Sequence, residues 1–326
     1  MQGQEASEQQ SGIKFNIGVD ISKLWLDVHV RPSGERLRVA NTAEGIRHLK
    51  RRLQRLDVAC VACEATGKWH RPLWRSLSAA GIPVAMTDPF RVRMFAKAQG
   101  ILAKTDRLDA AVLSAFAALM SPAPRPPPPQ ALEDLAELIT ARDSAVAERS
   151  GLKNQLAAAK VAFLRRQLTR RIDSLDRVIA TLEREIGKRI AAEPGLARRY
   201  AILVSVPGFG AAVATTLIVR LAELGSLTAK QIGMLAGLAP IANQSGGRDG
   251  ARVVWGGRAI VRRMLYLAAV TAVRCNAAMK AFYHRLRTAV KPAKLALVAV
   301  ARKLAVLANT LTAQDRTWLP EPPQHH

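Results

Sequence analysis

A run of prolines divides this chain. Residues 122–129 read PAPRPPPP, so six of the eight positions are proline. Proline lacks a backbone N–H and has a fixed φ angle, so a run this dense can form neither a helix nor a central strand. It acts instead as a stiff spacer. We therefore expect a first domain over residues 13–120 and a proline-rich linker over 121–130.

The segment before the prolines alternates strand and helix signals. Short runs rich in β-branched residues predict strands, and an apolar period near 3.6 predicts helices. The expected strands are residues 15–20, 25–32, 35–40, 58–64 and 82–86, and the expected helices are 42–56, 69–80 and segments up to about 118. The resulting order, βββαβαβα, is that of the ribonuclease H fold, so we expect an α/β first domain.

After the prolines, apolar residues recur at spacings of three and four. The seam comprises Leu168, Ile172, Leu175, Ile179, Leu182 and Ile186. Such a repeat is typical of a coiled coil. We expect a coiled-coil pair of antiparallel helices over residues 131–195, with a turn near the basic segment FLRRQLTRR. The pattern is compatible with an internal hairpin and with an oligomerisation arm.

Residues 196–315 are expected to form a mainly α-helical C-terminal domain. Its segment LVSVPGFGAAVATTLIVRL resembles a helix-hairpin-helix, in which Gly208 and Gly210 would let backbone N–H groups approach a phosphate. The alternative is an ordinary turn between two buried helices. The uncharged run at 202–219 is long enough for a short membrane span, but its Pro-Gly-Phe-Gly breaks the helix, so no membrane partner is expected.

The charge of the chain indicates a polyanionic partner. The sequence has 49 Lys and Arg against 25 Asp and Glu, a formal net charge of +24, and residues 245–303 hold thirteen bases and one acid. Nucleic acid is the leading candidate for such a surface. The N-terminus lacks the apolar core of a signal peptide, and only three cysteines are present, which together predict a cytoplasmic protein. Cys60 and Cys63 read as buried strand residues rather than zinc ligands.

Four carboxylates stand at positions that suit metal binding. Asp20 ends the first expected strand, Glu64 ends the fourth, and Asp106 and Asp109 share one face of a helix. Clustered carboxylates repel one another unless cations neutralise them. Oxygen ligands suit Mg²⁺, and two such ions can serve a phosphoryl transfer. Each acid alone could simply cap a turn or a helix. Asp27 and Asp88 are expected to be structural.

A single serine lies in the most glycine-rich stretch, NQSGGRDGARVVWGGR, residues 243–258. Taken by itself, a serine between Gln and Gly is usually a turn residue. On a flexible, basic loop it could instead reach a backbone phosphate. The residues of this stretch leave both interpretations open for Ser245.

Several motifs together resemble those of one family. They are GVDISKLWLDV, EATGKWHRPL, AKTDRLDA, VPGFG, LAGLAP followed by QSGG, RRMLYLAA and FYHRL. In this order they resemble the DEDD transposases of the insertion-sequence one-hundred-and-ten type and the related Piv DNA invertases, from Phe15 to about Leu311. The resemblance implies a RuvC-like N-terminal domain, a coiled coil and a C-terminal transposase domain.

The resemblance also implies roles for individual residues. It assigns the metal-binding tetrad to Asp20, Glu64, Asp106 and Asp109, and the nucleophile to Ser245. It further implies a noncoding bridge RNA that pairs with donor and target DNA. This chain departs from the family pattern at Val253–Arg258 and at Asn276-Ala277. Arginines of this region are expected to bind phosphate: Arg248, Arg252, Arg258, Arg262 and Arg263.

The expected protein is thus a bacterial, nucleoid-associated recombinase. It would join DNA strands through a serine and two Mg²⁺ ions, with guide RNA held by basic helices, and would work as a dimer or tetramer. Two alternatives remain from the residues: a Holliday-junction nuclease, which needs only the tetrad, and a non-enzymatic basic nucleic-acid-binding protein, which needs neither tetrad nor serine.

Overall fold

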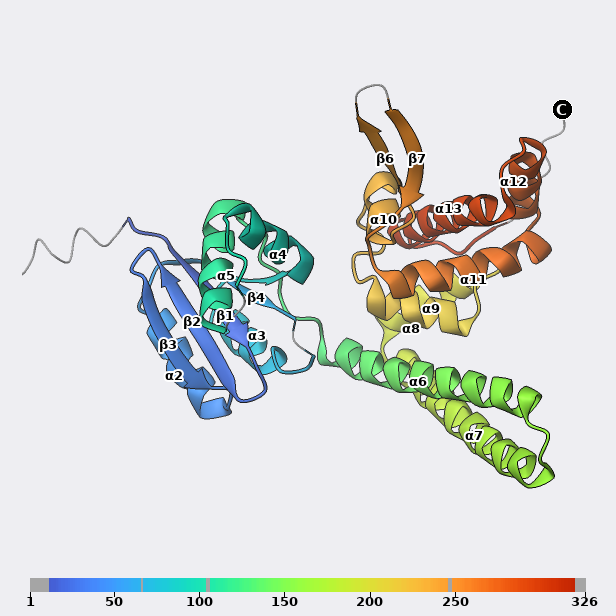
Figure 1. Cartoon of the computed structure of the whole chain (residues 1–326), viewed down its shortest axis with the longest axis horizontal. Helices are drawn as coiled ribbons and strands as arrows, with labels where there is room; N and C mark the ends of the chain where they lie inside the picture. The colour runs from blue at the N-terminus through green and yellow to red at the C-terminus, as the bar shows by residue number, and fades with distance from the viewer. Residues whose placement is uncertain (1–11, 66, 104–105, 246–247, 320–326) are drawn as a thin grey trace, which may run out of the picture. The chain divides into compact units, whose positions relative to one another are not determined.

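A computed structural model of the chain describes residues 12–65, 67–103, 106–245 and 248–319. Side chains are described for these residues except 106–107 and 242–252. Contacts divide the chain into two compact units, residues 1–128 and residues 129–326 (Figure 1). Each unit has its own apolar core and is described separately.

The first unit is built on a mixed five-stranded sheet. Its strands are β1 (Phe15–Ile21), β2 (Trp25–Arg31), β3 (Glu35–Ala40), β4 (Val58–Glu64) and β5 (Val84–Thr87). They lie in the order β3-β2-β1-β4-β5. The first three are antiparallel, and β1, β4 and β5 are parallel. All five predicted strands are therefore present, in an arrangement consistent with the ribonuclease H fold.

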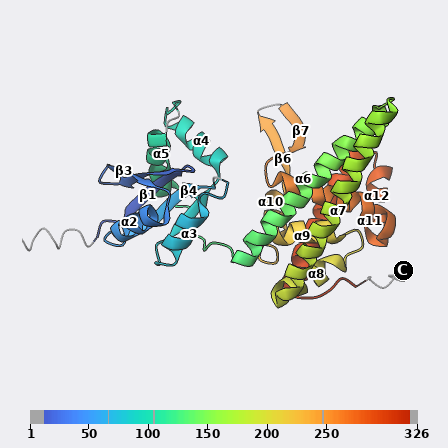
Figure 2. The ribbon, with the colours of Figure 1, turned by 90° about the horizontal axis from the view of Figure 1, so that it is seen from below.

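Helices cover both faces of this sheet (Figure 2). The helices are α2 (Ala43–Leu53), α3 (Arg71–Ser78), α4 (Pro89–Ala98) and α5 (Asp106–Met120). Alternate residues of β4 enter two separate apolar clusters, so Cys63 packs with the α2 and α3 side and Cys60 with the α4 and α5 side. Both cysteines are buried, as predicted. Asp88 accepts a hydrogen bond from the backbone N–H of Phe90 at 3.0 Å and caps α4, which confirms its structural role.

Gly18 lets α5 lie directly on the sheet. A Cβ placed on Gly18 would stand 2.0 Å from the carbonyl oxygen of Ala110 and 2.4 Å from the backbone nitrogen of Ser114. No side chain fits in that space. The glycine therefore fixes where the first turns of α5 cross β1.

The proline segment runs along the first unit. The N–H of Arg125 donates to the carbonyl of Val84 on β5 at 3.0 Å, and the indole N–H of Trp74 donates to the carbonyl of Arg125 at 3.0 Å. Arg75 donates to the carbonyl of Pro128 at 3.0 Å. The sequence predicts an extended spacer, and the structure adds that α3 and β5 hold it by hydrogen bonds.

The second unit begins with a helical hairpin of α6 (Gln130–Ala158) and α7 (Ala162–Ala192). The predicted seam packs inside this hairpin, where Leu168 and Ile172 meet Leu152, and Ile186 and Ile190 meet α6 residues near its start. The turn precedes the basic segment, and Arg165 donates to the carbonyls of Leu156 and Ala159, which end α6. Of the two interpretations of the seam, the structure has the internal hairpin.

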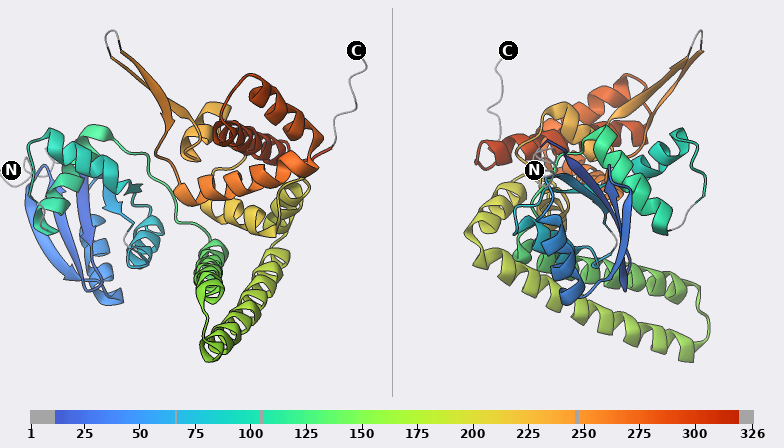
Figure 3. Two further views of the ribbon diagram at one scale, coloured as in Figure 1. Left: turned by 45° about the vertical axis from the view of Figure 1, so that its right-hand side comes forward. Right: turned by 90° about the vertical axis from the view of Figure 1, so that its left-hand side faces the viewer.

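The rest of the second unit is mainly helical (Figure 3). Its helices are α8 (Pro194–Val204), α9 (Ala211–Arg220), α10 (Ala229–Leu235), α11 (Ala259–Cys275), α12 (Ala277–Thr288) and α13 (Ala293–Ala313). Within the described residues, α13 is the one helix long and apolar enough to cross a membrane. It packs in this unit's core, where Val300, Leu304 and Leu311 are fully buried.

The stretch predicted as a glycine-rich loop forms a β-hairpin instead. Strands β6 (Pro240–Ser245) and β7 (Arg248–Val254) pair antiparallel and project from the helices (Figure 3). Between them the sequence has two glycines, the residues that two-residue hairpin turns favour, a signal that our prediction of a loop did not use. Residues 246–247 themselves lie outside the described residues.

Candidate active site

Two of the predicted carboxylates meet at one edge of the sheet. Val19 and Cys63 are paired in the parallel register of β1 and β4, and the next residues along these strands are Asp20 and Glu64. Residues of a strand alternate between faces. Asp20 therefore shares a face with Gly18, and Glu64 shares it with Ala62, which is the face that α5 covers.

Helix α5 brings the third carboxylate to the same edge. Asp109 directly precedes Ala110, whose carbonyl lies above Gly18 of β1, two residues from Asp20. Asp106 begins the helix one turn earlier, but its side chain lies outside the described part of the chain. The three described carboxylates, Asp20, Glu64 and Asp109, are half-buried and have partners.

This donor set fits Mg²⁺ in its chemistry. Carboxylate oxygens are the ligands that Mg²⁺ takes from proteins, and the ion commonly uses only one or two of them together with water and substrate phosphate. Within the described residues no three acidic, histidine or cysteine side chains form a group that could hold an ion alone. The prediction of a four-carboxylate site therefore depends on Asp106, and it stays a prediction.

Asp27, which is not one of the four predicted metal ligands, lies beside Asp20. The two residues are register partners on β1 and β2, so they occupy the same face of the sheet. Asp27 is buried and receives two hydrogen bonds from Arg38, Nε to Oδ1 and Nη2 to Oδ2, both 2.8 Å long. The structural role predicted for Asp27 is confirmed, but its position next to Asp20 was not foreseen.

His29 connects β2 to α5 close to these acids. Its Nδ1 lies 2.7 Å from Oγ of Ser114, and its backbone partner on β1 is Gly18. Burial lowers the pKa of His29, and the positive charges of Arg36 and Arg31 lower it further. The imidazole is therefore held toward its neutral form at the junction of sheet and helix.

Basic and aromatic residues form the rim of the same edge. The ammonium groups of Lys23 and Lys68 stand over the ring of Trp69 at 5.7 and 5.6 Å. The side-chain amide of Asn41 donates to the carbonyls of Ser22 and Trp69, which ties the two rim loops together. The edge that carries the acids thus has a positively charged border.

In the second unit, Ser245 is the last residue of β6, and its register partner is Arg248 at the start of β7. The side chains of Ser245, Arg248 and Arg252 lie outside the described residues. Ser245 belongs to a different compact unit from the carboxylates. The structure therefore places the serine next to the tip of the hairpin and leaves its predicted chemistry untested.

The remaining predicted arginines have different environments. Arg258 forms a two-pronged ion pair with Glu223, and Arg262 donates to the carbonyl of Gly256 at 2.6 Å. Both hold the base of the β-hairpin. Arg263 is exposed on α11 and has no hydrogen-bond partner among the described residues. Arg263 is thus the one of these three whose guanidinium the fold does not use.

The glycines of the α8–α9 turn also have different roles. Gly208 has a φ of +107°, and a Cβ there would stand 2.6 Å from Cβ of Ala272 on α11. Gly210 precedes α9, with open space around its Cα. Close packing on α11 is therefore sufficient to require glycine at 208, as in the alternative of an ordinary turn, and phosphate binding at either position stays a prediction.

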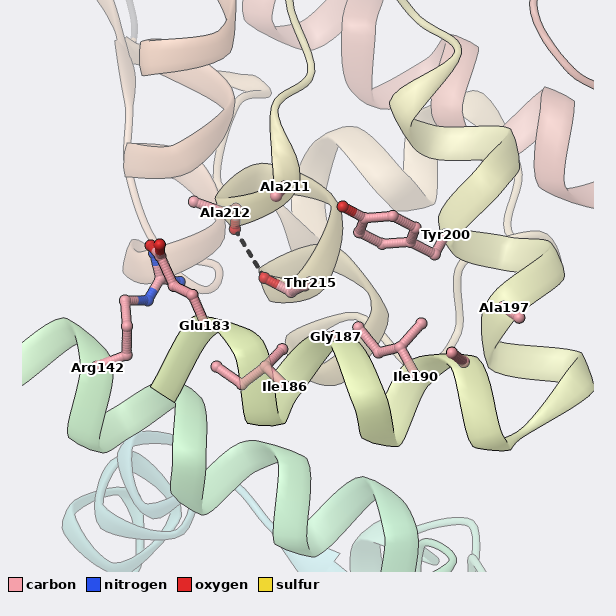
Figure 4. Close-up of a pocket in the computed structure, with 11 residues that line it drawn as sticks. Arg142, Glu183, Ile186, Gly187, Ile190, Ala197, Tyr200, Ala211, Ala212 and Thr215 are labelled. Carbon is pink, nitrogen blue, oxygen red and sulfur yellow. Dashed lines mark hydrogen bonds between the residues drawn. The ribbon is translucent and has the colours of Figure 1, made fainter. Parts of the chain in front are cut away.

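A cavity of about 220 Å³ lies between the helical hairpin of α6 and α7 and the helices α8 and α9 (Figure 4). Ile186, Gly187 and Ile190 of α7 line one side, and Tyr200 and Thr215 line the other. None of the predicted site residues lines it. This cavity is therefore separate from the candidate chemistry.

Two family profiles match the chain in the regions just described. Residues 17–165 match a transposase profile of the DEDD IS110 type, and this match spans the sheet, its carboxylates, helix α6 and the first turn of α7. Residues 200–284 match the profile of the transposase IS116/IS110/IS902 family, which includes the serine and the arginines. The chain belongs to the IS110 family of DEDD transposases. Membership in this family makes it a DNA recombination enzyme, and a DEDD domain implies metal-dependent cleavage of DNA.

Two curated relatives of this IS110-family transposase are the pilin gene-inverting proteins of Moraxella bovis and Moraxella lacunata. Each is 24% identical over 315 residues, which cover 94% of this chain and 98% of the relative. The predicted relation to Piv invertases is thus confirmed at a distant level. The similarity extends across both compact units.

Proposed function

We propose that this transposase cuts and rejoins DNA strands through Ser245 and a Mg²⁺-dependent site formed by Asp20, Glu64, Asp106 and Asp109. One observation carries the proposal: three of the four acids gather at one edge of the sheet from three separate elements, because β1 and β4 are parallel and α5 is seated on Gly18.

The tetrad would hold the metal, which supplies activation of the attacking oxygen and stabilisation of the leaving oxygen when it is bound. The protein's part is to orient the carboxylates. Strand pairing fixes Asp20 and Glu64 relative to each other, and the contact of Ala110 with Gly18 fixes Asp109. Such positioning by strands and a packed helix gives a more rigid site than a loop would.

The serine would conserve the energy of the broken bond. Attack of its Oγ on a DNA phosphorus forms a serine phosphodiester and breaks the bond to a deoxyribose oxygen, which takes up the proton that the serine loses. A hydroxyl of another strand then reverses the step and releases the serine. Its place beside the tip of a projecting ribbon supports access to a DNA backbone.

The test uses two variants with different expected outcomes. Asp109→Asn should abolish strand joining while the protein keeps its folded circular dichroism spectrum. Ser245→Ala should lose the covalent protein–DNA adduct on a denaturing gel. Normal recombination by the first variant in Mg²⁺, or an adduct that survives in the second, contradicts the proposal. DNA hydrolysis without joining by the wild-type protein would instead indicate a nuclease.

We further propose that a structured noncoding RNA guides the choice of DNA, in a dimer or tetramer acting at the bacterial nucleoid. Exposed bases on α2 and directly after it support RNA binding, namely Arg47 and Arg51 on the helix and Arg55 beyond its end. Near the hairpin turn, Arg166 stands over Phe163, whereas Arg171 is paired with Glu148 and Arg165 caps α6. The helix α2 is thus the better-supported RNA surface, through phosphate and 2′-hydroxyl contacts.

Recombination by nuclease-stripped protein tests the guidance. Activity at a defined site should need RNA transcribed from the element's flanking noncoding segment. Equal site-specific activity with and without that RNA excludes guidance and leaves the strand-joining chemistry unaffected. Light scattering of the RNA-bound protein gives the oligomeric state.

A further inference from the structure

A hollow lies beside the edge of the sheet that carries Asp20, Glu64 and Asp109, and its two arginines suit the binding of a phosphate. It has a volume of about 300 Å³ and is lined by Asp27, Arg36 and Arg38 together with Val28, Leu37 and Ala110. Its wall on α5 is the residue that follows Asp109. None of the residues predicted from the sequence as catalytic or nucleic-acid-binding lines it.

Sheet register places the two arginines on the face that carries the acids. Asp20 pairs with Asp27, and Asp27 pairs with Arg38, so the three residues form one row across β1, β2 and β3. The neighbouring row runs from Gly18 through His29 to Arg36. With strands about 4.8 Å apart, Arg38 lies about 10 Å from Asp20 along its row, close to the axial rise of three nucleotides in B-DNA.

The two arginines differ in how they are held. Arg38 is fixed by the two hydrogen bonds to buried Asp27 and stands over the half-exposed ring of Trp25 at 5.9 Å. Arg36 is exposed and has no hydrogen bond or ion pair among the described residues. The hollow is therefore lined by two guanidinium groups: that of Arg38 is held in place by Asp27, and that of Arg36 is available for a ligand.

The surrounding charge favours an anion. Asp27 is already matched by Arg38, which leaves the charge of Arg36 uncompensated at the hollow. The pKa of His29 is lowered first by burial, and the positive charges of Arg36 and Arg31 lower it further, which agrees with positive potential on this face. Helix α5 packs on β1, β2 and β4. A nucleic-acid strand can therefore approach this face of the sheet beside β3.

We propose that Arg36 and Arg38 bind a backbone phosphate of the DNA strand that the tetrad processes, with Asp27 as the positioning residue for Arg38. The inference rests on the proposed function. If the neighbouring acids cut DNA, the strand that lies across the hollow is DNA rather than RNA. Arg36 supplies the mobile contact and Arg38 the fixed one.

The first test measures DNA and RNA binding of the full-length protein by fluorescence anisotropy, in EDTA so that no joining occurs. Arg36→Gln should lower the slope of log K against log salt by about one for a DNA duplex, as expected for one lost phosphate contact. The matched control is Arg47→Gln on α2, across the sheet, which removes the same charge and should leave the DNA slope unchanged. An unchanged DNA slope for Arg36→Gln overturns the proposal.

A photo-crosslink identifies the occupant. A benzophenone amino acid at position 36 should crosslink to labelled DNA in the presence of the RNA, and the same group at position 47 should not. Crosslinking at 36 to RNA alone, or to neither, contradicts the proposal. These measurements are independent of strand joining, so an inactive Asp109→Asn protein can serve in both, and failure of the proposed chemistry remains distinguishable.

Discussion

Arg258 and Glu223 form a two-pronged ion pair, in which Nη1 lies 2.7 Å from Oε2 and Nη2 lies 2.8 Å from Oε1. Nη1 also donates to the carbonyl of Arg220 at 2.9 Å. These contacts join the first residue before α11 to the end of α9. The base of the serine-bearing hairpin is therefore attached to the helical core by an arginine that the sequence indicates only as a phosphate ligand.

Replacing the acid of this pair should be costly. Glu223→Ala leaves a half-buried guanidinium without its partner, so we expect a loss of about 1–3 kcal/mol in the free energy of unfolding, less than for a fully buried pair. Urea denaturation provides the measurement. The control is Glu185→Ala, which removes an exposed i,i+4 pair with Arg189 and should change the free energy of unfolding much less than Glu223→Ala does.

Gly18→Ala should damage both fold and activity. The added Cβ would stand 2.0 Å from the carbonyl of Ala110, so α5 must move and Asp109 must move with it. Overpacking of this kind costs about 1–3 kcal/mol or more. Thermal unfolding and strand joining would both decline. The same exchange at Gly151 in α6, where an added Cβ meets nothing within 4 Å, should instead be neutral or stabilising.

Gly187→Ala should stabilise the second unit. Gly187 lies in α7 and lines the cavity of Figure 4, and no atom stands within 4 Å of an added Cβ. Alanine in a helix interior is favoured over glycine by about 0.5–1 kcal/mol. Gly151→Ala provides the gain from helix propensity alone, because Gly151 does not line this cavity. A gain at 187 that exceeds the gain at 151 measures the benefit of filling the cavity, and a loss at 187 would contradict the open space seen there.

The cysteines should react at very different rates. Burial raises the pKa of Cys63 to about 12 and also raises that of Cys60, whereas Cys275 is exposed. The thiolate is the reactive form. Alkylation of the native protein followed by peptide mass mapping should therefore label Cys275 first, and the other two only after denaturant is added. Fast labelling of Cys63 without denaturant would show that the sheet opens readily.

Mild acid should destabilise the first unit through His29. Its pKa in the folded chain is below the ordinary 6.5, so the unfolded chain binds the proton more readily. The stabilisation by neutral His29 is complete above pH 6.5 and is lost as the pH falls toward the lowered pKa. Denaturation at several pH values should show this loss in the wild type, and His29→Gln should reduce it. His48→Gln on exposed α2 is the control.

The strands of the first unit could be predicted from short runs rich in β-branched residues. Strands β1 and β4 have consecutive buried residues, as expected for central strands that are covered on both faces. The placement of Asp20 and Glu64 at strand ends follows from the same pattern. Their meeting at one edge needs the parallel pairing of β1 with β4, which a single sequence does not encode locally. The position of Asp27 beside Asp20 likewise depends on register, and so does the hollow between Arg36 and Arg38.

Glycine was the hardest residue to interpret. Gly208 was predicted to approach phosphate, yet it packs against Ala272, which lies 64 residues further along the chain. Gly18 drew no prediction although it seats α5. In the stretch around Ser245, the glycines indicated flexibility, whereas paired strands flank them. A glycine can indicate either close packing against a neighbouring element or a backbone turn, and the sequence alone does not distinguish the two.

The length of the helical hairpin can be compared with the dimensions of a DNA duplex. Helix α7 has 31 residues, and at about 1.5 Å per residue it extends about 46 Å. B-form DNA rises about 3.4 Å per base pair, so the arm is as long as about 13 base pairs, which exceeds one turn of the duplex. Two groups bound at the two ends of the hairpin, one near Phe163 and one at its base, would therefore lie more than one helical turn of a DNA duplex apart.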